Sequence, residues 1–184
     1  MSRQDSRNEL LGKAVAHVGE RGMGDMSLRG LAESIGTSHR MLLYHFGSRE
    51  QLLVQILQRL RAEEQRTYSA GIPDISRVQL LRRLWDLYTS PESDARIRNF
   101  FYVIGLAAQQ PDLYREFLDS LADWTTILHE QGLREGLDDK RAATEAHLLT
   151  CSVRGLVLDL ITSGDHPRAQ DAFDLLCASL ERSD

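Results

Sequence analysis

The chain has few of the residues that cross-link, stiffen or anchor a protein. Two of its 184 residues are cysteine and four are proline, which argues against a disulfide-held secreted scaffold and a proline-rich linker. No apolar run approaches the roughly 20 residues that cross a bilayer, and the N-terminal segment has no apolar core of a secretion signal. We therefore expect a soluble cytoplasmic protein with no membrane partner.

The usual signatures of catalysis are also missing. The six histidines show no HxxxH or HExxH spacing, and the chain contains no GxSxG elbow, P-loop or dinucleotide fingerprint. Cys151 and Cys177 are far apart and without ligand-like neighbours. They are interpreted as reduced apolar fillers, with a redox-sensing pair as the alternative. The sequence thus predicts neither an enzyme nor a bound cofactor or metal.

What the chain does contain is a compact motif between Ser27 and Glu50. Ser27 is a candidate helix N-cap, and Gly36 can adopt the left-handed conformation of a helix end. Between them, apolar residues recur with the spacing of one helical face; these are Leu28, Leu31, Ala32 and Ile35. A second short helix begins near Ser38. Two short helices joined by a glycine turn are typical of a helix-turn-helix.

The second of these helices carries a polar face that suits DNA. Hydroxyl, imidazole and guanidinium groups donate hydrogen bonds to phosphate oxygens, and arginine also reads guanine edges. The helix that opens at Ser48 adds a positive helix end and a cation. The residues predicted to contact DNA are Ser27, Ser38, His39, Arg40, Tyr44, His45 and Arg49. The alternative is an ordinary helical hairpin whose polar face is only solvated.

Charge is distributed unevenly along the chain. Residues 1–50 hold seven Lys and Arg against six Asp and Glu, a net charge of +1, so the rest of this chain of net charge −5 carries −6. An acidic body behind a donor-rich end favours a protein that docks one end on DNA by geometry. It argues against a protein that coats nucleic acid by bulk electrostatic attraction.

A family resemblance lies in the segment MSLRGLAESIGTSHRMLLYHFGSREQLL. It resembles the DNA-binding domain of TetR/AcrR-type transcriptional regulators. The features that match are Ser27, Leu31-Ala32-Glu33, Gly36, Leu42-Leu43-Tyr44-His45-Phe46 and Ser48-Arg49-Glu50-Gln51-Leu52. Two features depart from the pattern: Leu43 stands where an aromatic is frequent, and His39-Arg40-Met41 replaces a commoner run of one basic and two small residues. These residues are expected to face the DNA bases, so the resemblance does not determine the operator sequence.

Helical periodicity continues through the rest of the chain and predicts an all-α fold of about nine helices. Residues 1–47 are expected to form a three-helix, helix-turn-helix DNA-binding domain. Residues 48–184 are expected to form a helical effector-binding and dimerisation domain, with the helix over 48–67 as the connector. The further helices are expected over 76–89, 92–109, 111–132, 140–162 and 167–181.

The middle helices are rich in aromatic side chains. Aromatics with scattered polar tips are used by pockets for small, partly apolar molecules, although ordinary core is the alternative for each. The resemblance implies that an effector, of unknown identity, binds in this region. The residues predicted to line the pocket are Trp85, Tyr88, Phe100, Phe101, Tyr102, Trp124, His129 and Arg154.

The last two expected helices carry more apolar surface than one monomer obviously needs. Either they complete the monomer's core or they pack against a second copy. The resemblance implies a homodimer held by a four-helix bundle of these helices. The residues predicted at the dimer interface are Leu149, Val153, Leu156, Leu160, Phe173, Leu176 and Leu180.

Motif and resemblance together predict a ligand-responsive, dimeric transcriptional regulator that binds a near-palindromic operator in double-stranded DNA. Repression is the family's default mode. The alternative is a helical small-molecule-binding or partner-binding module whose helix-turn-helix no longer binds DNA.

Overall fold

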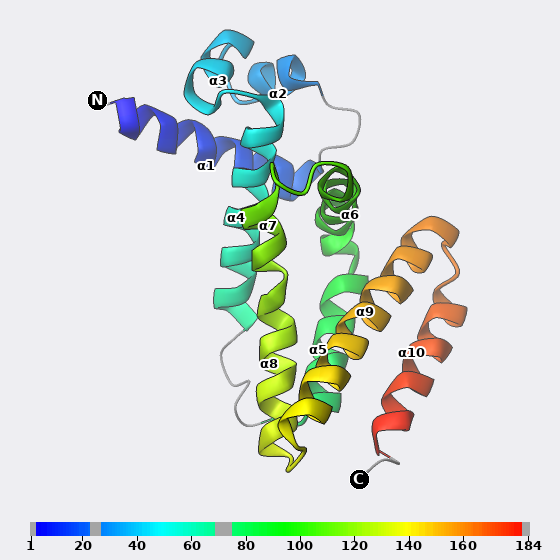
Figure 1. Ribbon diagram of the computed structural model, residues 1–184. Helices are drawn as coiled ribbons and strands as arrows, with labels where there is room; N and C mark the ends of the chain where they lie inside the picture. Colours follow the sequence, from blue (N-terminus) through cyan, green and yellow to red (C-terminus); the bar gives the residue numbers. More distant parts are fainter. Residues whose placement is uncertain (1–2, 23–26, 69–74, 182–184) are drawn as a thin grey trace. The chain divides into compact units, whose positions relative to one another are not determined.

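The computed structural model describes residues 3–22, 27–68 and 75–181, and for residues 64–68 the backbone alone (Figure 1). Within these ranges the chain is helical and contains no strand, so the predicted all-α fold is confirmed. The chain divides into two compact units. Unit 1 comprises residues 1–68 and 95–120, and unit 2 comprises residues 69–94 and 121–184.

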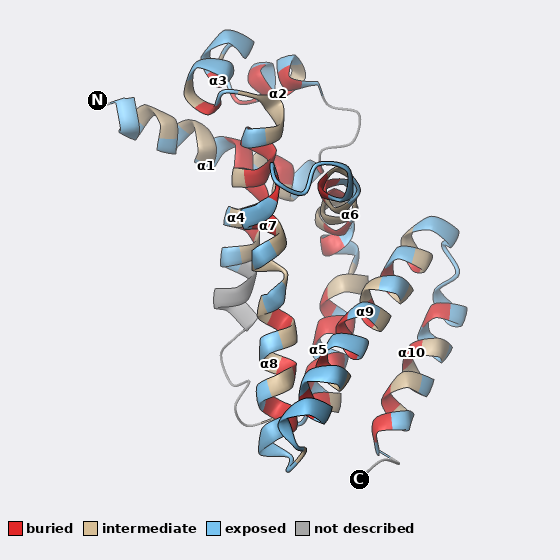
Figure 2. Cartoon of the chain, in the orientation of Figure 1, coloured by how far each residue is buried: buried red, intermediate tan, exposed pale blue. Residues whose placement is uncertain are grey.

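Unit 1 contains the helix-turn-helix and the helices that support it. Its helices are α1 (Arg3–Arg21), α2 (Leu28–Ser34), α3 (His39–Phe46), α4 (Arg49–Tyr68), α6 (Asp94–Gln109) and α7 (Arg115–Ser120). The inner faces of the first four share one apolar core, and most of their outer faces are exposed (Figure 2). The buried residues of that core are Ala14, Val15, Val18, Leu28, Leu31, Ala32, Ile35, Leu42, Phe46, Leu52, Leu53, Ile56 and Leu60.

Helix α6 packs against the C-terminal end of α1. The Asn99 side chain donates a hydrogen bond to the Val18 carbonyl over 3.5 Å. Gly22 has a φ of +74°, and a Cβ built on it would lie 3.2 Å from Ala95 Cβ, so this close approach requires glycine. The aromatic run over 100–104 forms a helix, as predicted, but it is not wholly buried, because its outer side faces solvent.

Unit 2 is a helical bundle. It contains α5 (Arg77–Thr89), the short 3₁₀ helix η2 (Pro91–Ser93), α8 (Ala122–Arg134), α9 (Asp139–Ser163) and α10 (His166–Glu181). Helix α9 packs along α8, and α10 packs against α9 and α5. The rings of Trp85 and Phe173 stack in the core, with centroids 4.4 Å apart and planes 6° from parallel. This stack fixes α10 to α5.

The single helix expected over 111–132 is two helices, α7 and α8, and this expectation was wrong. Helix α7 begins only at Arg115, and the helices are separated at Leu121. The Ser120 hydroxyl donates to the Phe117 carbonyl over 2.6 Å, and the Ser120 carbonyl accepts from Arg61 over 2.9 Å. These side-chain bonds offer the backbone an alternative to the continuing helix.

Helix α9 is long and apolar enough, by length and composition, to cross a membrane, which the apolar runs of the sequence did not suggest. The helix is nevertheless amphipathic. One face carries Leu149, Val153 and Val157 into the interior of unit 2. The Asp159 carboxylate, elsewhere on the helix, accepts hydrogen bonds from Arg168 over 2.8 and 2.9 Å. These contacts are those of a core helix within a helical bundle.

Candidate nucleic-acid interface and effector region

The turn between α2 and α3 has the geometry that its sequence predicts. The Ser27 hydroxyl oxygen accepts a hydrogen bond from the Gly30 amide over 3.1 Å and so caps α2. Gly36 has a φ of +73°, and the Thr37 amide donates to the Ala32 carbonyl over 2.9 Å. Such a bond satisfies a free carbonyl at the helix end. Ala32 is buried and lets the two helices approach.

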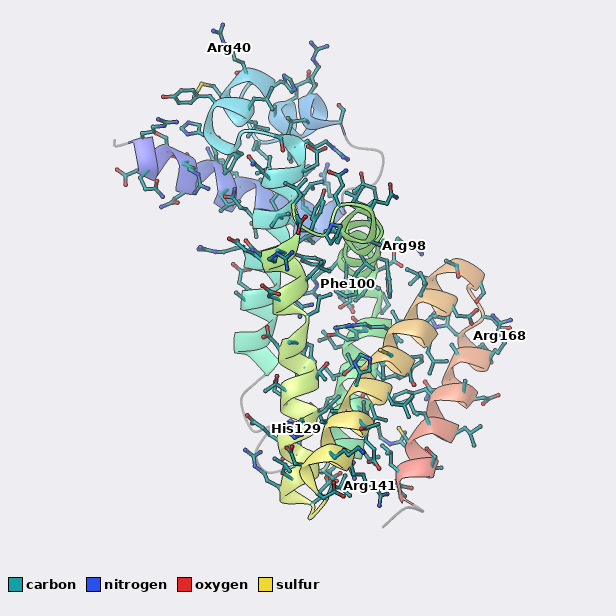
Figure 3. All side chains as sticks on the ribbon, in the orientation of Figure 1. Arg40, Arg98, Phe100, His129, Arg141 and Arg168 are labelled. Atoms are coloured by element: carbon teal, nitrogen blue, oxygen red, sulfur yellow. The ribbon has the colours of Figure 1, made fainter. Side chains whose placement is uncertain are left out.

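Helix α3 has one buried face and one exposed face. The Ser38 hydroxyl oxygen caps the helix by accepting from the Met41 amide over 3.1 Å. Leu42 and Phe46 are buried in the core of unit 1. His39 and Arg40 are exposed on the other side, and Arg40 extends away from the helix (Figure 3). Tyr44 is also exposed, with 56% of its surface accessible. The outward face therefore offers an imidazole, a guanidinium and a phenol.

Ser27 and Ser38, which were predicted to contact DNA, have a structural role as helix caps. Ser27 and Ser38 each accept one backbone N–H through the hydroxyl oxygen. A hydroxyl proton remains on each side chain, and it can be donated to a phosphate oxygen. Both residues therefore stay predicted DNA contacts.

His45 is less exposed than its neighbours on α3. Both of its ring nitrogens are buried and have no hydrogen-bond partner among the described residues. Its ring contacts the Tyr44 ring edge-on, with centroids 5.1 Å apart. Its backbone carbonyl accepts from the Arg7 guanidinium over 3.3 Å. A DNA contact by His45 therefore requires its imidazole to turn outward.

Helix α4 opens at Arg49, as predicted, with Ser48 capping it and with the acidic Glu50 beside the Arg49 cation. The Ser48 hydroxyl oxygen accepts from the Gln51 amide over 3.1 Å. The Arg49 guanidinium donates to the Tyr102 phenol oxygen over 2.9 Å and lies 5.7 Å from the centre of that ring. A predicted DNA contact on α4 is thus held by a residue of α6 within unit 1.

Two arginines of α1 belong to this surface and were missed by the sequence analysis. The Arg3 guanidinium lies 4.6 Å from the centre of the Tyr44 ring. Arg7 lies 5.2 Å from the Phe46 ring centre and also donates to Gln55. Because Arg3 and Arg7 precede Tyr44 and Phe46 by about forty positions, the helix-turn-helix motif carries no signal for these contacts.

The residues predicted to line an effector pocket fall in both units. Phe100, Phe101 and Tyr102 belong to unit 1. Phe100 packs edge-on against Phe101 and contacts Phe117, and the Arg61 guanidinium lies 5.8 Å from its ring centre. Tyr102 is partly exposed, with 40% of its surface accessible. These contacts account for the three rings without a ligand.

The other five predicted pocket residues belong to unit 2. Trp124 is buried and Tyr88 is half-buried. The His129 ring nitrogen lies 2.9 Å from an Asp139 carboxylate oxygen, and Arg154 donates to the Leu121 carbonyl over 3.0 Å. Arg154 therefore joins α9 to the start of α8.

Trp85 lines a cavity of about 280 Å³ between α5, α9 and α10. Its indole N–H donates to the Gln170 side-chain oxygen over 2.7 Å at the cavity wall. The other lining residues are Thr89, Leu160, His166, Pro167 and Gln170. Apart from Trp85, none of the residues that the sequence analysis assigned to a pocket lines this cavity.

Burial corrects the predicted dimer interface. Five of its seven residues, Leu149, Val153, Leu160, Phe173 and Leu180, are buried inside unit 2. Their stripe faces the monomer's own core, which was the alternative interpretation. Leu156 and Leu176 are half-buried.

The outward face of α9 and α10 carries a different set of apolar residues. Leu148, Leu158 and Leu175 are exposed, with 59%, 42% and 65% of their surfaces accessible. A shallow groove of about 500 Å³ runs between the two helices. Its lining residues are Ser152, Gly155, Leu156, Ala172, Leu175, Leu176 and Ser179.

Comparison with known proteins agrees with the helix-turn-helix geometry. Residues 10–56 match the family model described as bacterial regulatory proteins, tetR family. The matched stretch reaches from α1 into α4 and includes all of α2 and α3. No match is found among the curated proteins.

Solved structures share the fold over nearly the whole chain. A transcriptional regulator from Rhodococcus sp. Rha1 is 21% identical, with a TM-score of 0.77 over 97% of both chains. A TetR-family transcriptional regulator from Cytophaga hutchinsonii is 13% identical, with a TM-score of 0.73 over 97% of this chain and 94% of that one. A transcriptional regulator from Saccharomonospora viridis, in complex with choline, is 21% identical, with a TM-score of 0.70 over 97% and 96%.

The family match covers the helix-turn-helix, and the structural similarity extends to the helical body. The chain therefore carries the N-terminal domain of the bacterial TetR regulatory family and has the fold of TetR-family transcriptional regulators.

Proposed function

We propose that this protein is a ligand-responsive transcriptional repressor that binds a near-palindromic operator as a homodimer. The observation that carries the proposal is the outward face of α3. It presents His39, Arg40 and Tyr44 to solvent, while Leu42 and Phe46 anchor the helix from behind. Such an exposed set of donors on a rigid helix suits the major groove.

The outward face of α9 and α10 supports the homodimer. Leu148 and Leu175 are exposed there, and an isolated monomer would leave this apolar surface in water. Gly155 lies in the middle of α9, and a Cβ built on it would meet nothing within 4 Å. The monomer therefore does not require glycine, although glycine costs a helix about 1 kcal/mol relative to alanine. A closely approaching second copy would require it.

Two-fold symmetry defines the expected operator. Two copies related by a two-fold axis would place their α3 helices in major-groove sites about 34–36 Å apart. The operator should then be close to palindromic, and each phosphate contact should be made twice. Since a repressor meets its operator where the chromosome lies, this function places the protein in the cytoplasm.

The cavity beside Trp85 is the proposed effector site. It combines an indole and two aliphatic side chains with Thr89, His166 and Gln170, which suits a small, partly apolar molecule with one or two hydrogen-bonding groups. The Saccharomonospora viridis structure with choline makes a small organic cation one class to test, since aromatic rings attract such cations. An effector that prefers the conformation with low DNA affinity would release the operator by population shift.

Selection of genomic fragments by the purified protein, followed by footprinting, tests this function. We expect a short, nearly palindromic footprint whose two halves are separated by about one helical turn. Binding of small molecules without enrichment of any DNA would instead support the ligand-binding alternative. Calorimetry with the selected operator present and absent then tests the effector. If no ligand changed operator affinity, the proposed response to an effector would be contradicted.

A further inference from the structure

Helix α9 displays a thiol and an imidazole side by side on its exposed surface. Cys151 Sγ and His147 Nε2 lie 3.7 Å apart and four positions apart in sequence, so they are neighbours on successive helical turns. Both residues are exposed. Cys151 is therefore not the apolar filler that was expected from the sequence. Cys177, by contrast, is buried.

The separation of these two atoms matches that of two ligands on one zinc ion. Zinc binds thiolate at about 2.3 Å and imidazole at about 2.0–2.1 Å, and tetrahedral angles then place the two ligand atoms about 3.6 Å apart. A metal could therefore bridge Cys151 and His147 without a change in the backbone. The thiol proton would pass to solvent, and no oxidation or reduction is involved.

One chain supplies only half of such a site. Among the described residues, no group of three or more metal-ligating side chains comes together. A second copy of the chain can supply two further ligands, and the outward face of α9 is where the proposed dimer would bring it. Gly155 lies one helical turn beyond Cys151 and would let two copies of α9 cross closely.

We propose that His147 and Cys151 from two copies of the chain bind one zinc ion, or a similar thiophilic divalent cation, in a Cys₂His₂ site at the dimer interface. This inference rests on the homodimer of the proposed function. A metal bound only by the dimer stabilises the dimer by mass action. Operator affinity should then rise with the free metal concentration, because two linked α3 helices bind DNA more tightly than one.

Cobalt(II) is the probe, since it takes the tetrahedral geometry of zinc and is coloured. Reduced, full-length protein is titrated with cobalt(II) alone and followed by absorption. We expect saturation at one cobalt per two chains, with a thiolate charge-transfer band and intense tetrahedral bands. Cys151→Ser should remove the charge-transfer band, and His147→Gln should weaken binding by about tenfold or more. Cys177→Ala, which removes the other thiol, should leave the spectrum unchanged.

Sedimentation with zinc or with a chelator separates failure of the site from failure of the dimer. We expect zinc to lower the dimer dissociation constant of the wild type by about tenfold or more, and to leave that of Cys151→Ser unchanged. A dimer that forms equally well in chelator and shows no thiolate–cobalt band would overturn the metal site and leave the proposed function intact. Saturation at one cobalt per chain would overturn the bridging arrangement. A protein that stays monomeric with and without zinc would overturn both the site and the dimer.

Discussion

The Arg49 guanidinium donates a hydrogen bond to the phenol oxygen of Tyr102 over 2.9 Å. This hydrogen bond joins the first turn of α4 to α6 within unit 1. Arg49 is a predicted phosphate contact, and Tyr102 was grouped from sequence with the effector pocket. Their pairing suggests that Tyr102 competes with DNA for the Arg49 guanidinium, so a shift of α6 would change the cation available at the start of α4.

Substitution of either partner tests this competition. Arg49→Ala should weaken operator binding and reduce the slope of log affinity against log salt by about 1 for each phosphate that the arginine neutralises. Tyr102→Phe removes the acceptor but keeps the ring, so it should raise affinity by a few-fold, in line with one exposed hydrogen bond of about 0.5–1.5 kcal/mol. Fluorescence anisotropy across a range of salt concentrations measures both effects. Arg115→Ala, another exposed arginine of unit 1, is the control. Arg49→Ala binding with wild-type affinity and slope would contradict the competition.

A cluster of charged side chains in unit 2 joins the start of α5, the end of α8 and the start of α9. The buried Arg77 guanidinium pairs with Glu135 and Glu145, and Arg141 donates to Glu145 over 2.8 Å. The Arg77 amide also donates to Glu135 over 2.7 Å. Burial raises the pKa of Glu145, but the hydrogen bonds from Arg141 and Arg77 and their positive charges outweigh it, so the pKa is lower than usual.

This lowered pKa predicts a loss of stability in acid. A carboxylate whose pKa is depressed by folding stabilises the fold above its unfolded pKa of about 4.3, and the contribution disappears as the pH falls through the folded value. Glu145→Gln should therefore destabilise the protein by roughly 1–3 kcal/mol at neutral pH and flatten the acid limb of the stability curve. Urea unfolding from neutral to acidic pH measures this. Glu130→Gln, in an exposed pair with Arg134, should preserve the wild-type profile. Equal stability of Glu145→Gln and Glu130→Gln across this pH range would contradict the role of Glu145.

Tyr114 carries a buried hydroxyl that finds no hydrogen-bond partner among the described residues. Burial raises its pKa, with a further contribution from the charge of Glu50. Because an unpaired buried hydroxyl opposes folding, Tyr114→Phe should leave stability unchanged or raise it by about 1 kcal/mol. Denaturant unfolding measures the difference. A clear loss of stability would show that the hydroxyl is satisfied in solution.

Gly155 offers a test of the dimer that does not involve metal. Alanine at this position meets open space in the monomer, so Gly155→Ala should stabilise the isolated helix by about 1 kcal/mol. In the dimer the added methyl should clash, and the dimer dissociation constant should rise. Gly12→Ala in α1 is the matched control, since Gly12 is equally open. Sedimentation of Gly155→Ala showing a dimer as tight as the wild type would exclude close approach at this residue.

Much of the fold could be predicted because its signals are local. The cap at Ser27, the start of a second short helix near Ser38 and the turn at Gly36 depend on residues a few positions apart, and the structure has all three. The break between α7 and α8 could not be predicted, because it depends on Arg61 donating to the Ser120 carbonyl from a distant part of the chain. Helical periodicity alone predicted one continuous helix over residues 111–132.

The candidate sites were also predictable where the signal is local, and not where it depends on contacts between distant helices. The exposed face of α3 follows from its own sequence. The contacts of Arg3 with Tyr44 and of Arg49 with Tyr102 required the packing of α1 and α6. Apolar stripes on α9 and α10 could not show which stripe faces the core, because both faces carry leucines. Burial assigns Leu149 and Phe173 to the interior and leaves Leu148 and Leu175 outside.

The most direct test of the central claim is the affinity of a Tyr44→Ala/His45→Ala double variant for the selected operator. Circular dichroism and sedimentation should first show that the variant keeps its fold and oligomeric state. Arg40→Ala, which alters a fully outward side chain, provides a second variant that cannot disturb the core. We predict that the affinity of the double variant falls by about 100-fold or more, since loss of the exposed Tyr44 phenol alone costs about 1–3 kcal/mol in each of the two subunits. Unchanged operator affinity in a folded double variant would contradict the assignment of α3 as the DNA-reading helix.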